Sequence, residues 1–107
     1  MISVNEANYG EVVLASKLPV LLDVYADWCP PCRRIAPLIE QLAVELEGRA
    51  VVAKLDSEAN PNLIARLGIN SLPTFLVFNE GVEVHRMVGL QSRETLLARL
   101  GARNLTG

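Results

Sequence analysis

The segment Trp28-Cys29-Pro30-Pro31-Cys32 lies between two stretches of different character. Before it runs an apolar stretch, 18–26, typical of a strand, and after it apolar residues recur at helical spacing through 35–46. The segment therefore predicts the first turn of a helix, where proline is tolerated. Amide N–H groups and the helix dipole at such a start stabilise a thiolate and lower the pKa of a cysteine. A Cys-x-x-Cys in this position indicates a redox-active pair, Cys29 and Cys32.

Three other roles for the cysteine pair are weaker. A structural disulfide stabilises mainly by closing a long loop, and this one spans four residues. A zinc site needs four ligands, and the other candidate of the usual soft type is His85, far along the chain. Haem attachment requires histidine directly after the second cysteine, where Arg33 stands. We therefore expect neither a metal nor a cofactor, and we expect His85 to be an exposed strand residue.

Length and charge limit the class of protein. The chain has 107 residues, enough for one core and too few for two, so a single domain over 1–107 is expected. A net charge of −2 argues against nucleic acid or an anionic membrane as the main partner, because surfaces that bind those are basic. The N-terminus lacks the features of a signal peptide and no apolar run is long enough to span a membrane, so a cytoplasmic protein is expected. The match of Asn104-Leu105-Thr106 to a glycosylation acceptor is interpreted as chance, because no export signal is recognised.

Apolar periodicity and turn residues predict strands alternating with helices. A helix is expected after Asn5, and a second should begin at Pro30 or Pro31 and bend at Pro37 without stopping. Asn60 and Ser92 are expected to cap the last two helices. Strands are expected at 2–4, 20–25, 50–55, 75–78 and 82–88, the last two joined by a tight turn at 80–81.

Asp23 is unusual because it is a carboxylate inside the apolar strand expected at 20–25. It lies either at an exposed edge or in the interior, where burial without a partner is costly and raises the pKa. The strand leads within a few residues to Cys29, which is compatible with a position of Asp23 beneath the cysteine pair. Lys54, in the strand expected at 50–55, is either a solvated side chain at the strand end or a cation near Asp23. The pattern leaves both questions open.

Several short stretches occur together in this chain. They are Asp23, Ala26-Asp27-Trp28-Cys29-Pro30-Pro31-Cys32-Arg33, Ile35-Ala36-Pro37, Ala53-Lys54-Leu55-Asp56, Ile69-Asn70-Ser71-Leu72-Pro73-Thr74 and Val88-Gly89. Each alone is a weak signal, but in combination they resemble the thioredoxin family over nearly the whole chain. The resemblance implies an α/β fold with a five-stranded mixed sheet flanked by four helices. It also implies a cis peptide bond between Leu72 and Pro73, since X-Pro is where cis bonds occur.

The resemblance further implies a protein disulfide oxidoreductase that reduces disulfide-containing proteins by dithiol–disulfide exchange. Cys29 would be the exposed thiolate that attacks the substrate, and Cys32 would be the more buried thiol that resolves the mixed disulfide. Asp23, with a raised pKa, would act as general base for Cys32, and Lys54 would tune Asp23 by its charge. A thioredoxin reductase would then recharge the oxidised protein, which is expected to be a monomer.

In the family, the loop before the cis proline lies against the cysteines and its backbone pairs with an extended substrate. The apolar docking surface implied for this chain consists of Trp28, Leu72, Pro73, Gly89 and Leu90.

One departure from the family pattern concerns the residue after the first cysteine, which is usually Gly and is Pro30 here. This departure suggests that Pro30 and Pro31 tune the reduction potential. An alternative function is therefore a disulfide oxidase or isomerase. A second alternative is a non-catalytic binding subunit built on the same fold, against which the intact cysteine pair argues.

Overall fold

A mixed sheet forms the centre of the molecule, described here by a computed structural model of residues 1–101. Residues 102–107, with the Asn104-Leu105-Thr106 match, lie outside the described part. The strands of the sheet are β1 (Ile2–Val4), β2 (Val20–Tyr25), β3 (Val51–Asp56), β4 (Thr74–Asn79) and β5 (Val82–Val88). In the sheet order β1-β3-β2-β4-β5, the first three strands run parallel and β4 and β5 are antiparallel to their neighbours.

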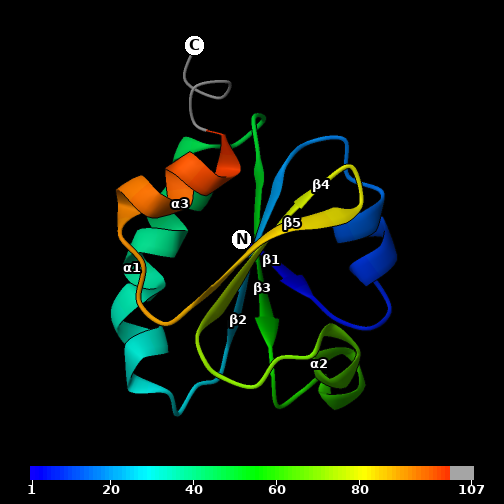
Figure 1. Cartoon of the computed structure of the whole chain (residues 1–107), viewed down its shortest axis with the longest axis vertical. Coiled ribbons are helices and arrows are strands. Elements are labelled where there is room, and N and C mark those ends of the chain that lie inside the picture. Colours follow the sequence, from blue (N-terminus) through cyan, green and yellow to red (C-terminus); the bar gives the residue numbers. More distant parts are fainter. Residues whose placement is uncertain (102–107) are drawn as a thin grey trace.

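Helices cover both faces of this sheet (Figure 1). They are η1 (Gly10–Leu14), α1 (Pro30–Glu45), α2 (Pro61–Leu67) and α3 (Arg93–Leu100). α1 and α3 pack on one face, where Ile39, Leu96 and Phe75 of β4 belong to one buried cluster, and η1 and α2 pack on the other. The expected fold class, a five-stranded mixed sheet with four helices, is thereby confirmed. No helix within residues 1–101 has the length and apolarity that crossing a membrane requires.

β2 is the middle strand, which explains its nearly continuous apolar sequence. Leu21 faces the core beneath α1 and α3, while Leu22 and Val24 face the core beneath η1 and α2. Because side chains alternate along a strand, Asp23 shares the α1 face with Leu21. Tyr25 ends the strand just before the cysteine segment, so β2 delivers that segment to the edge of the sheet where α1 begins.

Two local features differ in detail from the predictions. A helix does follow Asn5, and reciprocal bonds between Asn5 and Asn8 hold the turn before it, but it is a π-helix of only five residues, Gly10–Leu14. Gly10 is a poor helix former at the point where an α-helix would have continued. Asn60 precedes α2 as expected, but its side chain makes no cap and donates instead to the Asp56 carbonyl at 3.0 Å.

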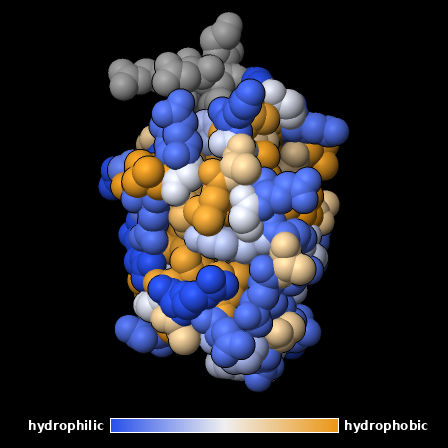
Figure 2. Space-filling model, turned by 90° about the vertical axis from the view of Figure 1, so that its right-hand side faces the viewer, coloured by the Kyte–Doolittle hydropathy of each residue, from blue (hydrophilic) through white to orange (hydrophobic). Residues whose placement is uncertain are grey.

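Figure 2 shows the side of the molecule that carries η1 and α2. Apolar side chains appear there as patches between hydrophilic ones, and one such patch lies in the lower part of this face. The edge strand β5 contributes exposed apolar residues, among them Val82 (61% exposed) and Val88 (58%). Exposed apolar area is ordinary on a folded protein, so these residues alone do not identify a binding site.

Candidate active site

The cysteine pair lies at the N-terminus of α1 and is bonded as a disulfide. Cys29 is the N-cap residue, with an extended backbone, and its Sγ accepts the N–H of Cys32 at 3.3 Å. Pro30 and Pro31 occupy the first helical positions, where a missing N–H has no intrahelical partner to lose. The positive end of the helix dipole and an amide donor thus point at the Cys29 sulfur, an arrangement that stabilises a thiolate there.

The expected difference in exposure between the two cysteines is not observed. Cys29 is 3% exposed and Cys32 is 4% exposed, because Tyr25, Ala26 and Leu72 pack around both. The two residues do face different spaces. Cys32 lines a cavity that contains Asp23, whereas Cys29 lines a groove beside Leu72. Location, rather than exposed area, distinguishes the two sulfurs.

The cavity behind Cys32 has a volume of about 190 Å³. Asp23 is 6% exposed, and within residues 1–101 its Oδ1 has no hydrogen-bond partner. Burial raises the pKa of Asp23 from an ordinary value of 3.8 to about 7, against the opposing charge of Lys54. The question that the sequence left open is therefore resolved: Asp23 is buried and shares a cavity with Cys32. The lining residues are Met1, Asp23, Tyr25, Ala26, Asp27, Cys32, Arg33, Ala36, Glu40 and Lys54.

Lys54 lies beside Asp23, because β2 and β3 pair in a register that puts these two residues opposite each other. The side chain is half-buried, and its ammonium lies 5.8 Å from the centre of the Tyr25 ring. A cation–π contact of this kind holds the ammonium at the wall of the cavity. Of the two interpretations, the structure supports a cation near Asp23.

Lys54→Met is expected to raise the pKa of Asp23 above its value of about 7, because the charge that lowers it is removed. The pH dependence of the carbon chemical shift of the Asp23 carboxyl group measures this. Lys17→Met, at an exposed lysine outside the cavity, is the control and should leave the titration unchanged. An unchanged titration in Lys54→Met would contradict the electrostatic coupling.

On the other side of the disulfide, a groove of about 350 Å³ adjoins Cys29. Trp28, 62% exposed, and Leu72 both contribute to it. The remaining lining residues, Ser57, Ile64, Ile69, Asn70 and Ser71, were not predicted as site residues. Ile69–Ser71 could have been inferred, since they precede Leu72 and Pro73 in the same irregular segment.

The other three predicted docking residues do not line this groove. Pro73 follows a cis peptide bond, as expected, but it is buried and not part of an exposed surface. Its carbonyl accepts the N–H of Gly89 at 2.8 Å, which brings Gly89 next to the loop. Leu90 follows Gly89 and is 53% exposed. The structure therefore brings Trp28 and Leu72 together beside Cys29, with Pro73 and Gly89 adjoining them.

Replacing Pro30 with glycine is expected to lower the free energy of unfolding by roughly 0.4–1 kcal/mol, because glycine gives the unfolded chain more freedom. The loss should occur in both redox forms, since both need the same first turn of α1. Denaturant melts of the oxidised and reduced protein measure it. Pro61→Gly, at the same position of α2, is the matched control and should cost a similar amount. A loss confined to one redox form would instead make Pro30 a residue that sets the reduction potential.

Within residues 1–101 no three His, Cys, Asp or Glu side chains cluster in a way that could hold a metal ion. His85 is exposed on β5, as expected from the sequence.

Comparison with known proteins identifies the family. The chain matches the family model described as Thioredoxin over residues 1–102. It is 41% identical over 97 residues to a thioredoxin of Synechocystis, and the alignment covers 91% of each chain. It is 38% identical over 95 residues to a thioredoxin of Rickettsia felis, covering 89% of this chain and 90% of the relative. It is also 41% identical over 93 residues to the chloroplastic M-type thioredoxin of Pisum sativum, covering 87% of this chain and 54% of the relative.

These matches agree with the chemistry that the site can perform. Two cysteines that bond across one helical turn exchange a disulfide for a dithiol, which is the reaction of thioredoxins. Members of the family act on disulfide-containing proteins and are in general reduced by a thioredoxin reductase. The chain belongs to the thioredoxin family of thiol–disulfide oxidoreductases.

Proposed function

We propose that this protein reduces disulfide bonds of other proteins, with Cys29 as nucleophile and Cys32 as resolving thiol. One observation carries the assignment of roles. The Sγ of Cys29 receives an amide N–H at the positive end of α1, while Cys32 shares its cavity with the buried carboxyl group of Asp23. The amide and the helix dipole stabilise the thiolate of Cys29, so Cys29 needs no nearby base. The carboxylate of Asp23 can accept the proton of the Cys32 thiol.

The reaction then proceeds in two exchanges. The Cys29 thiolate attacks one sulfur of the substrate disulfide, forms a mixed disulfide and releases the other substrate sulfur as a thiolate. Asp23, as a carboxylate, takes the proton of Cys32, directly or through water in the cavity. The Cys32 thiolate attacks the Cys29 sulfur, which releases the second substrate sulfur and leaves the Cys29–Cys32 disulfide. Two electrons pass to the substrate, and Lys54 adjusts the pKa at which Asp23 accepts the proton.

Substrate docking involves Trp28 and Leu72, with Gly89 and Leu90 extending the surface and the buried Pro73 lying beneath the loop. Support comes from the groove beside Cys29 and from the exposure of Trp28 and Leu90, which gives an incoming chain apolar area to cover. A segment that lies in the groove would bring its disulfide to Cys29. Leu72 contacts the cysteine cluster, so substrate bound there would lie next to the reacting sulfur.

We also propose where and in what form the protein works. A monomeric single domain in the cytoplasm, recharged by a thioredoxin reductase, is consistent with the net charge of −2 and with the identities to thioredoxins that span about nine-tenths of their length. Pro30 is the one feature that favours the alternative function of a disulfide oxidase or isomerase, because a residue between the cysteines can alter the relative stability of the two redox forms.

Equilibration with a glutathione redox buffer tests the direction of exchange. We expect a reduction potential well below that of the glutathione couple, as a reductant requires. The fraction of reduced protein, quantified by thiol alkylation over a series of glutathione ratios, gives this potential. A potential near or above that of the couple would indicate an oxidase or isomerase. Pro30→Gly, measured in parallel, shows whether the residue after Cys29 is responsible.

A further inference from the structure

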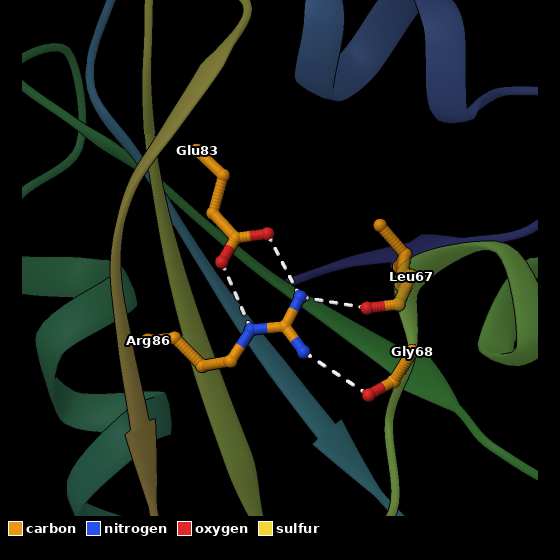
Figure 3. A network of polar contacts seen from close by, with 4 residues as sticks. All are labelled: Leu67, Gly68, Glu83 and Arg86. Carbon is orange, nitrogen blue, oxygen red and sulfur yellow. Dashed lines mark hydrogen bonds and ion pairs between the residues drawn. The ribbon is translucent and has the colours of Figure 1, made fainter.

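Arg86 of β5 makes a network of four hydrogen bonds with two different parts of the chain (Figure 3). Its Nε and Nη2 each donate to one carboxylate oxygen of Glu83, both at 2.9 Å. Nη2 also donates to the carbonyl of Leu67 at 2.7 Å, and Nη1 donates to the carbonyl of Gly68 at 3.1 Å. One guanidinium thereby joins β5 to the end of α2, across 18 and 19 residues of sequence.

A bulge in β5 makes this network possible. Glu83 pairs with Phe78 and His85 pairs with Val77, so Val84 has no partner in β4. In a regular strand, residues three apart point to opposite faces of the sheet, which would separate Glu83 from Arg86. The extra residue shifts the alternation by one, and both side chains then lie on the face that carries α2.

The acceptors of Arg86 are the last carbonyls of α2. Leu67 is the final residue of the helix, and Gly68 is its C-cap in the left-handed conformation, with φ of 66°. Carbonyls at a helix C-terminus carry the negative end of the dipole and lack intrahelical donors, so a guanidinium is a favourable partner. Bonds to a charged donor are stronger than those between neutral groups. The network therefore fixes the point at which the chain leaves α2.

The segment that starts at this point is the loop beside the cysteines. Residues 69–72 line the groove next to Cys29, and residues 69–71 also line a second hollow of about 180 Å³, which Arg86 borders. Between these hollows Ile69 and Leu72 pack against the core, and hydrogen bonds hold both ends of the loop. At its far end Gly89 donates to Pro73 and the Thr74 hydroxyl donates to the Ser71 carbonyl. At its near end the Ile69 N–H donates to the Ile64 carbonyl at 3.2 Å, and Arg86 binds the carbonyls of Leu67 and Gly68 just before it.

We propose that Arg86 is a positioning residue that holds loop 69–72 in the shape that accepts a substrate chain. This inference rests on the proposed docking of substrate in the groove beside Cys29. Loss of the anchor would leave the loop to be ordered at the moment of binding, which weakens affinity and leaves the chemistry at the disulfide unchanged. Arg86 thus affects the binding of protein substrates, and it has no effect on the reduction of disulfides too small to touch the loop.

Steady-state reduction of two substrates tests the proposal: insulin, a protein disulfide substrate, and dithiobis(nitrobenzoate), a small one. Arg86→Met is expected to raise KM for insulin by about two- to tenfold with kcat unchanged, and to leave the small substrate unaffected. Arg86→Lys, which keeps the charge and loses the fork, should give a similar rise. Arg99→Met, at an exposed arginine of α3, is the matched control and should change neither reaction. Hydrogen exchange at residues 69–72 should be faster in both Arg86 variants and unchanged in Arg99→Met.

Leu72→Ala separates failure of this inference from failure of the docking proposal. A raised KM for insulin in Leu72→Ala, with an unchanged KM in Arg86→Met, would overturn the role of Arg86 alone. An unchanged KM in Leu72→Ala would overturn docking in the groove, and the inference with it. Equal loss of kcat for both substrates in Arg86→Met would show a general structural role and would also overturn it. If Arg86→Met does not fold, Arg86→Lys takes its place, and an unchanged KM for insulin in that variant would overturn the proposal.

Discussion

Cys29→Ser is expected to abolish reduction of a protein disulfide, whereas Cys32→Ser is expected to accumulate covalent adducts with substrate. The reason is the different surroundings of the two sulfurs. Cys29 lies at the N-cap of α1 with an amide donor on its Sγ and opens to the groove, so it makes the first attack. Without Cys32 that attack still occurs, but nothing within the protein displaces the substrate.

Non-reducing denaturing gels of each variant, mixed with oxidised protein substrate, measure these adducts. The double variant with serine at both positions is the control and should form none. Adducts should disappear on addition of a small thiol, which replaces the missing Cys32. Equal adduct formation by both single variants would overturn the assignment of nucleophile and resolving thiol. The effect is close to all-or-none, which makes this the largest change in activity expected for the chain.

Asp23→Ala is expected to stabilise the protein by up to about 4 kcal/mol above pH 7, the largest stability effect expected. Folding raises the pKa of this carboxyl group from 3.8 to about 7, mainly through burial. Each factor of ten in the proton equilibrium corresponds to about 1.4 kcal/mol. Above the folded pKa the carboxylate is charged and desolvated, so the full free-energy cost of burying the charge destabilises the native state. Alanine removes that cost.

The pH dependence has a definite sign. Between about pH 4 and pH 7 the folded state binds the Asp23 proton and the unfolded state releases it, so stability falls as pH rises. The stabilisation by Asp23→Ala should therefore be near zero below pH 4, grow through this window and level off above it. Denaturant melts across pH measure it. Asp27→Ala, an exposed carboxylate of the same cavity, is the control and should stay within about 0.5 kcal/mol of the parent protein. A variant no more stable at pH 8 would contradict the buried, unpartnered state of Asp23.

The same substitution should slow the second exchange. Single-turnover reactions that follow release of substrate from the mixed disulfide are expected to show a slower step in Asp23→Ala, with the dependence on a group of pKa about 7 lost. The first attack by Cys29 should keep its rate. A slower first attack with an unchanged second exchange would assign Asp23 to the other thiol.

Features with local causes were predictable from the chain alone. The start of α1 at Pro30 is one such feature. It depends on proline in the first turn and on the apolar stripe that follows, and both are set by residues that are near neighbours in sequence. The bond between Cys29 and Cys32 follows from a spacing of three residues across that turn. The fold class and the cis bond before Pro73 came from the resemblance of short segments, which the structure and the family match confirm.

Features that depend on distant contacts were not predictable. Burial of Asp23 follows from the central place of β2 and from the register that sets it opposite Lys54. The nearly equal burial of the two cysteines follows from packing of Leu72, which is 40 residues beyond Cys32 in sequence. The Arg86 network requires a one-residue bulge in β5 and the end of α2 to meet. Periodicity shows which residues share a face within one element. Register, bulges and the packing of loops depend on contacts between elements that are distant in sequence, so a local segment does not determine them.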